Sequence, residues 1–147
     1  MASSIREQIV QQVLAALAPV AVTHGANLLR SPPVCVTREQ SPALLLFPES
    51  DAIDRRPNDR VERNLVIRLT ALARGSEADT PELVADRLLV DAHAALFADA
   101  NFGGLAIGLR ELECEWEVED ADATLAAIPA RYQITYRTLA ADISQQG

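Results

Sequence analysis

Lysine is absent from the chain, and several other residue types are scarce. All 13 basic residues are arginine, against 21 acidic residues, so the net charge at neutral pH is −8. Because neutralising phosphates requires a positive surface, an acidic chain is a poor general binder of nucleic acid. A GC-rich coding sequence would also lack lysine, so we attach no function to its absence.

Cysteine is equally sparse. Cys35 and Cys114 are the two cysteines, and they stand 79 positions apart, outside any spacing of a metal or redox motif. No apolar run approaches the ~20 residues that cross a bilayer. The apolar stretch near the N-terminus is interrupted by Gln11 and Gln12, unlike that of a secretory signal. These absences predict reduced thiols, no membrane partner and a cytosolic setting.

Motifs of catalysis are missing as well. His24 and His93, the two histidines, have no glutamate, cysteine or second histidine at helical spacing that would complete a metal site. The chain has no Gly-x-Ser-x-Gly elbow and no glycine-rich phosphate loop, and the Gly103-Gly104 pair is typical of a helix end. We therefore expect no catalytic residue, no metal and no cofactor, and a protein that is not an enzyme.

What is present is the composition of an ordinary folded domain. The 147 residues have a mass of 15.9 kDa, and 49% of them are hydrophobic. This length predicts a single domain over residues 1–147 with one hydrophobic core. The last residues, 140–147, are expected to form a flexible tail.

Two amphipathic helices are predicted. The first spans residues 4–18, where the sequence Ser-Ile-Arg-Glu at 4–7 is a capping box and Pro19 ends the helix. The second begins at the capping residue Thr80, which is followed by a proline, and runs to about residue 98. In both segments apolar residues recur every three or four positions, so each helix has one face for burial.

Five strands complete the prediction. Two short strands, Val34–Val36 and Ala43–Phe47, would form a hairpin, and the second is apolar at every position, which indicates burial on both faces. The polar stretch from Pro48 to Arg60 is expected to be a long loop. The remaining three strands are expected at Val61–Ala73, Leu105–Glu119 and Arg131–Thr138. The segment Asp120–Pro129, between the last two, is expected to be irregular.

The order of these elements is helix, three strands, helix, two strands. It predicts an α+β fold: a single mixed or antiparallel sheet of about five strands, with both helices packed on one face.

Glutamates alternate with other, mostly apolar, residues along the second half of the predicted strand Leu105–Glu119. Three interpretations remain open: cross-strand pairing with Arg131 and Arg137, an acidic surface that meets a neighbouring subunit, or a divalent-cation site. Alternation would place all of these glutamates on one face, namely Glu111, Glu113, Glu115, Glu117 and Glu119.

Arginines gather in and beside the predicted loop, at Arg55, Arg56, Arg60 and Arg63. They could be solvated among the interleaved aspartates, or they could form an arm that contacts an acidic partner or passing DNA. Their charge is opposite to that of the glutamates, and they stand elsewhere in the chain. Opposite charges at different places on one chain suit a head-to-tail contact between copies, which can close into a ring.

Nearly the whole chain resembles the phage tail terminator proteins, the minor tail protein U-like family of long-tailed phages and prophages. The order and spacing of several segments carry this resemblance, none of which is a catalytic fingerprint. They are Ile-Arg-Glu-Gln-Ile-Val at 5–10, Pro-Ala-Leu-Leu-Leu-Phe-Pro at 42–48, Arg-Asn-Leu-Val-Ile at 63–67, Thr-Pro-Glu at 80–82, Phe-Gly-Gly-Leu at 102–105, the acidic strand 111–119, and Tyr-Gln-Ile-Thr-Tyr-Arg-Thr at 132–138.

The resemblance implies an α+β protein of the virion tail that assembles in the bacterial host cytoplasm. Such proteins form a hexameric ring on the last ring of the tail tube protein, stop tube elongation, and provide the surface for the head-completion or connector protein. DNA passes through the lumen without sequence-specific binding. Carried over, Arg55, Arg56 and Arg60 would line the lumen or contact the tube. The alternating glutamates and Arg137 would lie at subunit contacts.

Two alternative functions stay open at the level of the sequence. One is a regulatory or enzymatic α+β domain that binds a small molecule, which would need a pocket with convergent polar groups. The other is a different head–tail connector module, with the same fold and a different ring as its partner.

Overall fold

A computed structural model describes residues 2–32, 42–56, 58–75, 78–114, 117–118 and 125–147. The expected strand at Val34–Val36 lies outside these residues, as do Glu115 and Glu119. The described elements, in chain order, are α1 (Ile5–His24), β1 (Asn27–Arg30), β2 (Ala43–Arg55), β3 (Arg60–Arg74), α2 (Pro81–Ala98), β4 (Gly108–Cys114), β5 (Glu117–Val118) and β6 (Leu125–Leu139).

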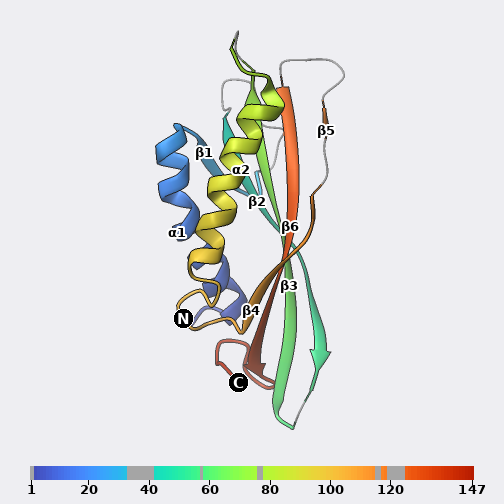
Figure 1. Cartoon of the computed structure of the whole chain (residues 1–147). Helices are drawn as coiled ribbons and strands as arrows, with labels where there is room; N and C mark the ends of the chain where they lie inside the picture. The colour runs from blue at the N-terminus through green and yellow to red at the C-terminus, as the bar shows by residue number, and fades with distance from the viewer. Residues whose placement is uncertain (1, 33–41, 57, 76–77, 115–116, 119–124) are drawn as a thin grey trace.

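The strands form one mixed sheet in the order β1-β2-β3-β6-β4, and β5 also pairs with β6. The short strand β1 runs parallel to β2, whereas every other pairing is antiparallel. Both helices lie against the same face of this sheet, as Figure 1 shows. The predicted α+β fold is therefore confirmed, and neither described helix lies on the other face of the sheet, which we call the open face.

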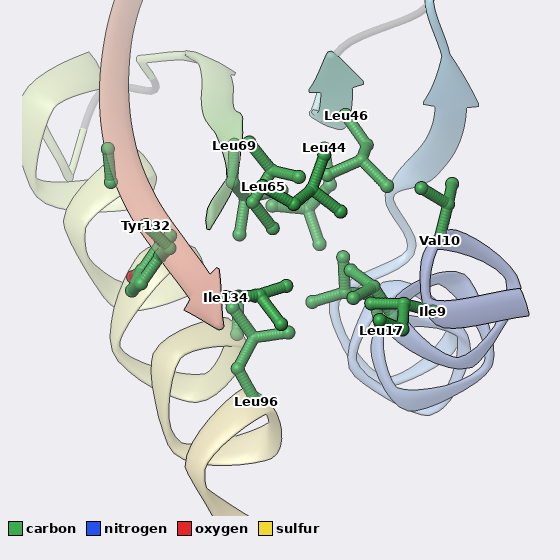
Figure 2. Packing of buried hydrophobic residues seen from close by; sticks show 14 of the residues in the cluster. Ile9, Val10, Leu17, Leu44, Leu46, Leu65, Leu69, Leu96, Tyr132 and Ile134 are labelled. Atoms are coloured by element: carbon green, nitrogen blue, oxygen red, sulfur yellow. The ribbon is translucent and has the colours of Figure 1, made fainter. Parts of the chain in front are cut away.

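The main core fills the space between the helices and the sheet. Ile9 and Leu17 of α1 and Leu96 of α2 are fully buried against alternate residues of the central strands. Figure 2 shows these side chains converging with Leu65 of β3 and Ile134 of β6. At about 25 cal/mol per Å² of apolar surface removed from water, this packing is the main source of the fold's stability.

The prediction of burial on both faces near the start of β2 is confirmed. Leu44 and Leu46 face the helices and have no exposed surface. Ala43 and Leu45 alternate with them and belong to a second, smaller cluster with Leu72 and Leu125 on the open face. The apolar run therefore serves two separate clusters.

The first helix begins as predicted and ends later than predicted. The Ser4 hydroxyl accepts a hydrogen bond from the Glu7 amide at 3.0 Å, as a capping residue does. However, α1 continues through Pro19 to His24, so the prediction that Pro19 ends the helix is wrong. The added turns bury Ala21 in the core side of the helix, and the helix then ends at the left-handed Gly25 (φ 63°).

The expected loop from Pro48 to Arg60 is also wrong, because β2 continues to Arg55 and pairs with β3. Two β-bulges, between Pro48 and Ser50 and between Ile53 and Arg55, let this polar segment keep its pairing. The ends of β2 and β3 thus form an arm, residues 50–56 and 58–64, whose tip extends past both helices in Figure 1.

Other boundaries shift by a few residues. The strand expected from Leu105 begins at Gly108, and the last strand begins at Leu125, inside the segment expected to be irregular. The second helix is confirmed, with the Thr80 hydroxyl accepting from the Leu83 amide at 3.3 Å. Residues 140–147 are expected from the sequence to form a flexible tail, and in the structure they make backbone hydrogen bonds. The Ile5 amide donates to the Ile143 carbonyl at 2.8 Å, and the Ala140 amide donates to the Asp59 carbonyl at 2.6 Å.

Candidate functional site

Chemistry-bearing side chains are dispersed over the described part of the molecule. No three histidine, cysteine, aspartate or glutamate side chains gather there in a metal-binding group. His24 contacts Asp91 at 2.6 Å at the surface, far along the chain from His93. Across the described helices, none combines the length and apolarity needed to span a bilayer.

A shallow groove with a volume of about 300 Å³ lies between α2 and β4. At its wall the His93 Nδ1 lies 2.9 Å from the Tyr132 hydroxyl and 3.2 Å from a Glu111 carboxylate oxygen. Burial, and then the charge of Glu111, raises the pKa of Tyr132. Burial, and then the charge of Glu111, also raises the pKa of Cys114, which favours the protonated thiol over the nucleophilic thiolate.

The predicted row of glutamates on one face does not exist, because a β-bulge at Leu112 interrupts the alternation. Glu111 pairs in register with Tyr132 and faces the helices, whereas Glu113 pairs with Arg131 and faces the open side. Sequence periodicity could not reveal the bulge, since the residue types alternate without a break. Beyond the bulge, Glu117 is described by its backbone pairing with Ala127 alone.

Cross-strand pairing with arginine holds for one glutamate of the series. Arg131 donates to Glu113 at 2.5 Å and to Glu49 of β2 at 2.7 Å, and Arg68 of β3 lies 3.6 Å from the same Glu49. The Arg68 guanidinium also stacks over the Phe47 ring at 4.4 Å. This network spans four strands of the open face.

The predicted arginine cluster is divided between two faces of the arm. Arg55 and Arg137 both approach the half-buried carboxylate of Glu62 on the open face, at 3.9 and 3.6 Å. Arg63 points to the helix side and donates to the Thr138 hydroxyl at 3.2 Å. Arg56 and Arg60 are exposed near the tip of the arm. Arg137 thus lies beside the arm and away from the glutamates with which the sequence grouped it.

Charge is segregated between the two faces of the sheet, a feature that sequence reasoning missed. Strand register and contacts place three glutamates on the open face: Glu49, Glu62 and Glu113. The same criteria place seven arginines there: Arg55, Arg60, Arg68, Arg74, Arg110, Arg131 and Arg137. Among the described side chains, arginines therefore outnumber glutamates on the open face by seven to three, on a chain whose net charge is −8.

The outer side of α2, which points away from the sheet, carries exposed apolar side chains with acidic neighbours. Leu83, Val90 and Phe97 are 41%, 59% and 40% exposed and stand seven residues apart, so they share one side of the helix. With the exposed Ala94 they form what we call the outer ridge. Asp86 and Asp91 flank it and are exposed. The spacing of seven residues is visible in the sequence as a second apolar stripe on the predicted helix, in addition to the stripe that faces the core.

Comparisons with known proteins identify a shared fold. No family model matches the chain, and no curated protein matches it in sequence. Among solved structures, a chain of the virion of a native gene transfer agent particle superposes with a TM-score of 0.56 at 14% identity. The match covers 90% of this chain and 90% of that chain. At this identity the likeness establishes that the two chains have the same fold.

Proposed function

We propose that this chain is a structural component of a phage-like particle, and within it the tail terminator. The observation that carries the proposal is the likeness to the gene transfer agent virion chain, which extends over nine-tenths of both chains. The order of segments along the sequence, which resembles that of the tail terminators, agrees with it. In this role the protein acts by assembly and needs no turnover.

The surfaces of the molecule suit an assembly protein. Away from its small apolar cluster, the open face is polar and basic, and the outer ridge is apolar with acidic flanks. The two surfaces lie on opposite sides of one slab. Complementary patches on opposite sides favour a head-to-tail contact, which closes into a ring when the rotation permits. A hexameric ring on the tail tube would then stop tube growth and present a surface for the head-completion protein.

The arm supplies the contact with the lumen or the tube. Arg55, Arg56 and Arg60 gather near its tip, which projects beyond the helices. In the proposed ring these arginines meet the end of the tail tube or the phosphates of passing DNA. Contacts to phosphate alone fit DNA that slides through without being read, because such contacts carry no sequence information.

Deleting the gene in the strain that encodes it tests this function. We expect particles with tails of irregular, excessive length and heads that lack tails, and expression of the chain from a plasmid should restore tails of uniform length. Electron microscopy of purified particles gives both readouts. Uniform tails joined to heads in the deletion strain would contradict the proposal. If electron microscopy of particles that carry a labelled copy of this chain placed the label within the connector, away from the tail end, a head–tail connector would be favoured instead.

The groove beside His93 supports a second candidate, a domain that binds a small molecule. Its volume stands at the lower limit for ligand pockets, and its polar groups already bind one another, which is why we rank it second. Native mass spectrometry of the protein purified from its host would test this candidate. A stoichiometric small molecule that is lost on the Glu111→Gln substitution would favour it over the terminator.

A further inference from the structure

The bare helix surface and the bare sheet surface have complementary properties. The outer ridge presents apolar side chains with the exposed Asp86 and Asp91 on its flanks. Asp91 also contacts His24 at 2.6 Å, and the one arginine of α2, Arg87, is bound to Asp79 at 3.1 Å. The open face presents arginines from β2, β3, β6 and β4. We propose that the outer ridge of one copy packs on the open face of the next copy. This inference rests on the proposed ring.

Like-with-like contacts fit the surfaces less well. Two outer ridges packed on each other would place the aspartates of one copy opposite those of its partner, and like charges in contact destabilise an interface. Two open faces packed together would oppose arginine to arginine. A ridge on an open face satisfies both surfaces with one contact, repeated around the ring.

The composition of the open face favours a protein surface over DNA as its partner. Away from the tip of the arm, glutamates are interleaved with its arginines: Arg131 is held between Glu113 and Glu49, and Arg137 lies 3.6 Å from Glu62. A phosphate backbone would have to approach these carboxylates. A helix that carries mainly apolar residues and two aspartates brings much less negative charge to the same surface, so the repulsion is smaller.

The size of the contact indicates how strong it is. A helix of 18 residues is about 27 Å long and about 10 Å wide, so the ridge covers a few hundred Å² of a neighbour. A stable complex usually buries about 800 Å² per partner. Free copies should therefore associate weakly, and the end of the tail would supply the rest of the binding free energy.

Photo-crosslinking from the ridge tests the contact on the full chain. A benzophenone amino acid replaces Val90, the variant is mixed with an isotopically labelled copy at high concentration, and mass spectrometry identifies the joined peptides. We expect crosslinks between copies, from position 90 to peptides of β2, β3 or β6. The yield should fall several-fold between about 50 and about 500 mM NaCl, because salt screens surface charge. Crosslinks to the partner's helices, or none between copies, would overturn the proposal.

Substitutions at exposed positions sharpen the test. We expect Arg110→Glu on the open face, and a charge at the ridge as in Val90→Arg, each to reduce crosslinking or sedimentation of the self-associated species at least about tenfold. Val22→Arg is the matched control for Val90→Arg, because Val22 is 82% exposed on α1, outside the ridge. If Val22→Arg weakens association as much as Val90→Arg, the ridge is not the contact.

Two further measurements separate this inference from the proposed function. If the chain binds duplex DNA, Arg110→Glu abolishes the binding and no crosslink forms between copies, then the open face is a nucleic-acid surface and the inference fails. In the deletion strain, plasmid-borne Val90→Arg should fail to restore uniform tails. If it restores them, the inference fails while the terminator function stands. Normal tails in the deletion strain itself overturn the function, whatever the crosslinks show.

Discussion

Asp51 joins the arm to the first helix through a single carboxylate. Its side chain is 7% exposed, it receives a hydrogen bond from the Tyr136 hydroxyl, and it pairs with Arg6 at 2.8 Å. Its second oxygen, Oδ1, is buried without a hydrogen-bond partner in the described structure. A buried carboxylate of this kind stabilises a fold only while its partners remain in place.

Removing this carboxylate should destabilise the protein measurably. We expect Asp51→Ala to lower the free energy of unfolding by about 2 kcal/mol, because it leaves the buried Tyr136 hydroxyl and the Arg6 guanidinium without their acceptor. Urea denaturation gives the value. Asp54→Ala, an exposed position on the same arm, is the control and should stay within about 0.5 kcal/mol of the parent protein. Equal effects of the two substitutions would contradict this role of Asp51.

Glu7 gives the stability a dependence on pH. Hydrogen bonds from Arg30, and then from Gln11, lower the pKa of Glu7 to about 2 in the folded chain, from 4.5. The ionised carboxylate therefore favours folding above pH 4.5, and this contribution disappears as the pH falls from 4.5 towards 2. Both side chains are partly exposed, so solvent limits the effect to less than about 1 kcal/mol.

The corresponding substitution is Glu7→Gln. The parent protein should be the more stable of the two at about pH 6, and the difference in urea midpoint should shrink steadily as the pH falls from 4.5 towards 2, because Glu7 becomes protonated over this range. Midpoints measured at several pH values check this. A difference that stays constant with pH would mean that packing or helix propensity, and not ionisation, separates the two proteins.

At the scale of whole elements, Pro19 inside α1 is the clearest departure from local preference. Proline removes a hydrogen bond of the helix interior and is about 3 kcal/mol less favourable than alanine there. Burial of Ala21 in the turn that follows Pro19 offsets this cost and allows the helix to continue. We expect Pro19→Ala to raise the free energy of unfolding by about 1–3 kcal/mol, measured by thermal and chemical denaturation. A lower stability would show that the packing of Ala21 depends on the geometry that proline imposes.

The elements also show how far the sequence determines the fold. Helix caps, the apolar strand at Ala43 and the long strand β3 follow from local rules and were predicted. The arm was missed because its polar composition indicates a loop, and pairing along β3 overrides that preference. The glutamates were placed on one face because a bulge at Leu112 leaves no trace in the alternation.

The candidate surfaces were predictable only in part. Sequence spacing identified the arginines of the arm and the glutamates as groups, yet the basic open face depends on which strands are neighbours. β6 pairs with β3 and β4, and this order brings Arg131 beside both Glu49 and Glu113, 82 and 18 positions away along the chain. No local pattern reports such a neighbourhood, because it arises only when the sheet is assembled.

At the scale of the molecule, the two ends of the chain hold each other. The Ile5 amide, which opens α1 and has no partner within the helix, donates to the Ile143 carbonyl at 2.8 Å. The Leu139 amide donates to Gln145, and the Gln146 side chain donates to the Gly104 carbonyl at 2.9 Å. The C-terminal residues thus close the base of the slab beneath the first helix.

Truncation after Leu139 should therefore loosen the opposite end of the chain. We expect the Ile5 amide to exchange its hydrogen at least about tenfold faster in the truncated protein, because its acceptor is gone. Hydrogen exchange followed by NMR measures this directly, with the amide of Val13 in the middle of α1 as the internal reference. Unchanged exchange at Ile5 would mean that the contact between the ends is not maintained in solution.

The pairing of β3 with β6 has a mechanical consequence. All fifteen residues of Arg60–Arg74 pair with Leu125–Leu139 without a shift in register, so one ladder about 50 Å long runs from the body of the molecule into the arm. The ladder has no break in register that would favour a hinge. A force that pulls the tip of the arm along the strands is shared by the hydrogen bonds of the whole ladder. A sideways force on the tip therefore tilts the arm and the body of the molecule together.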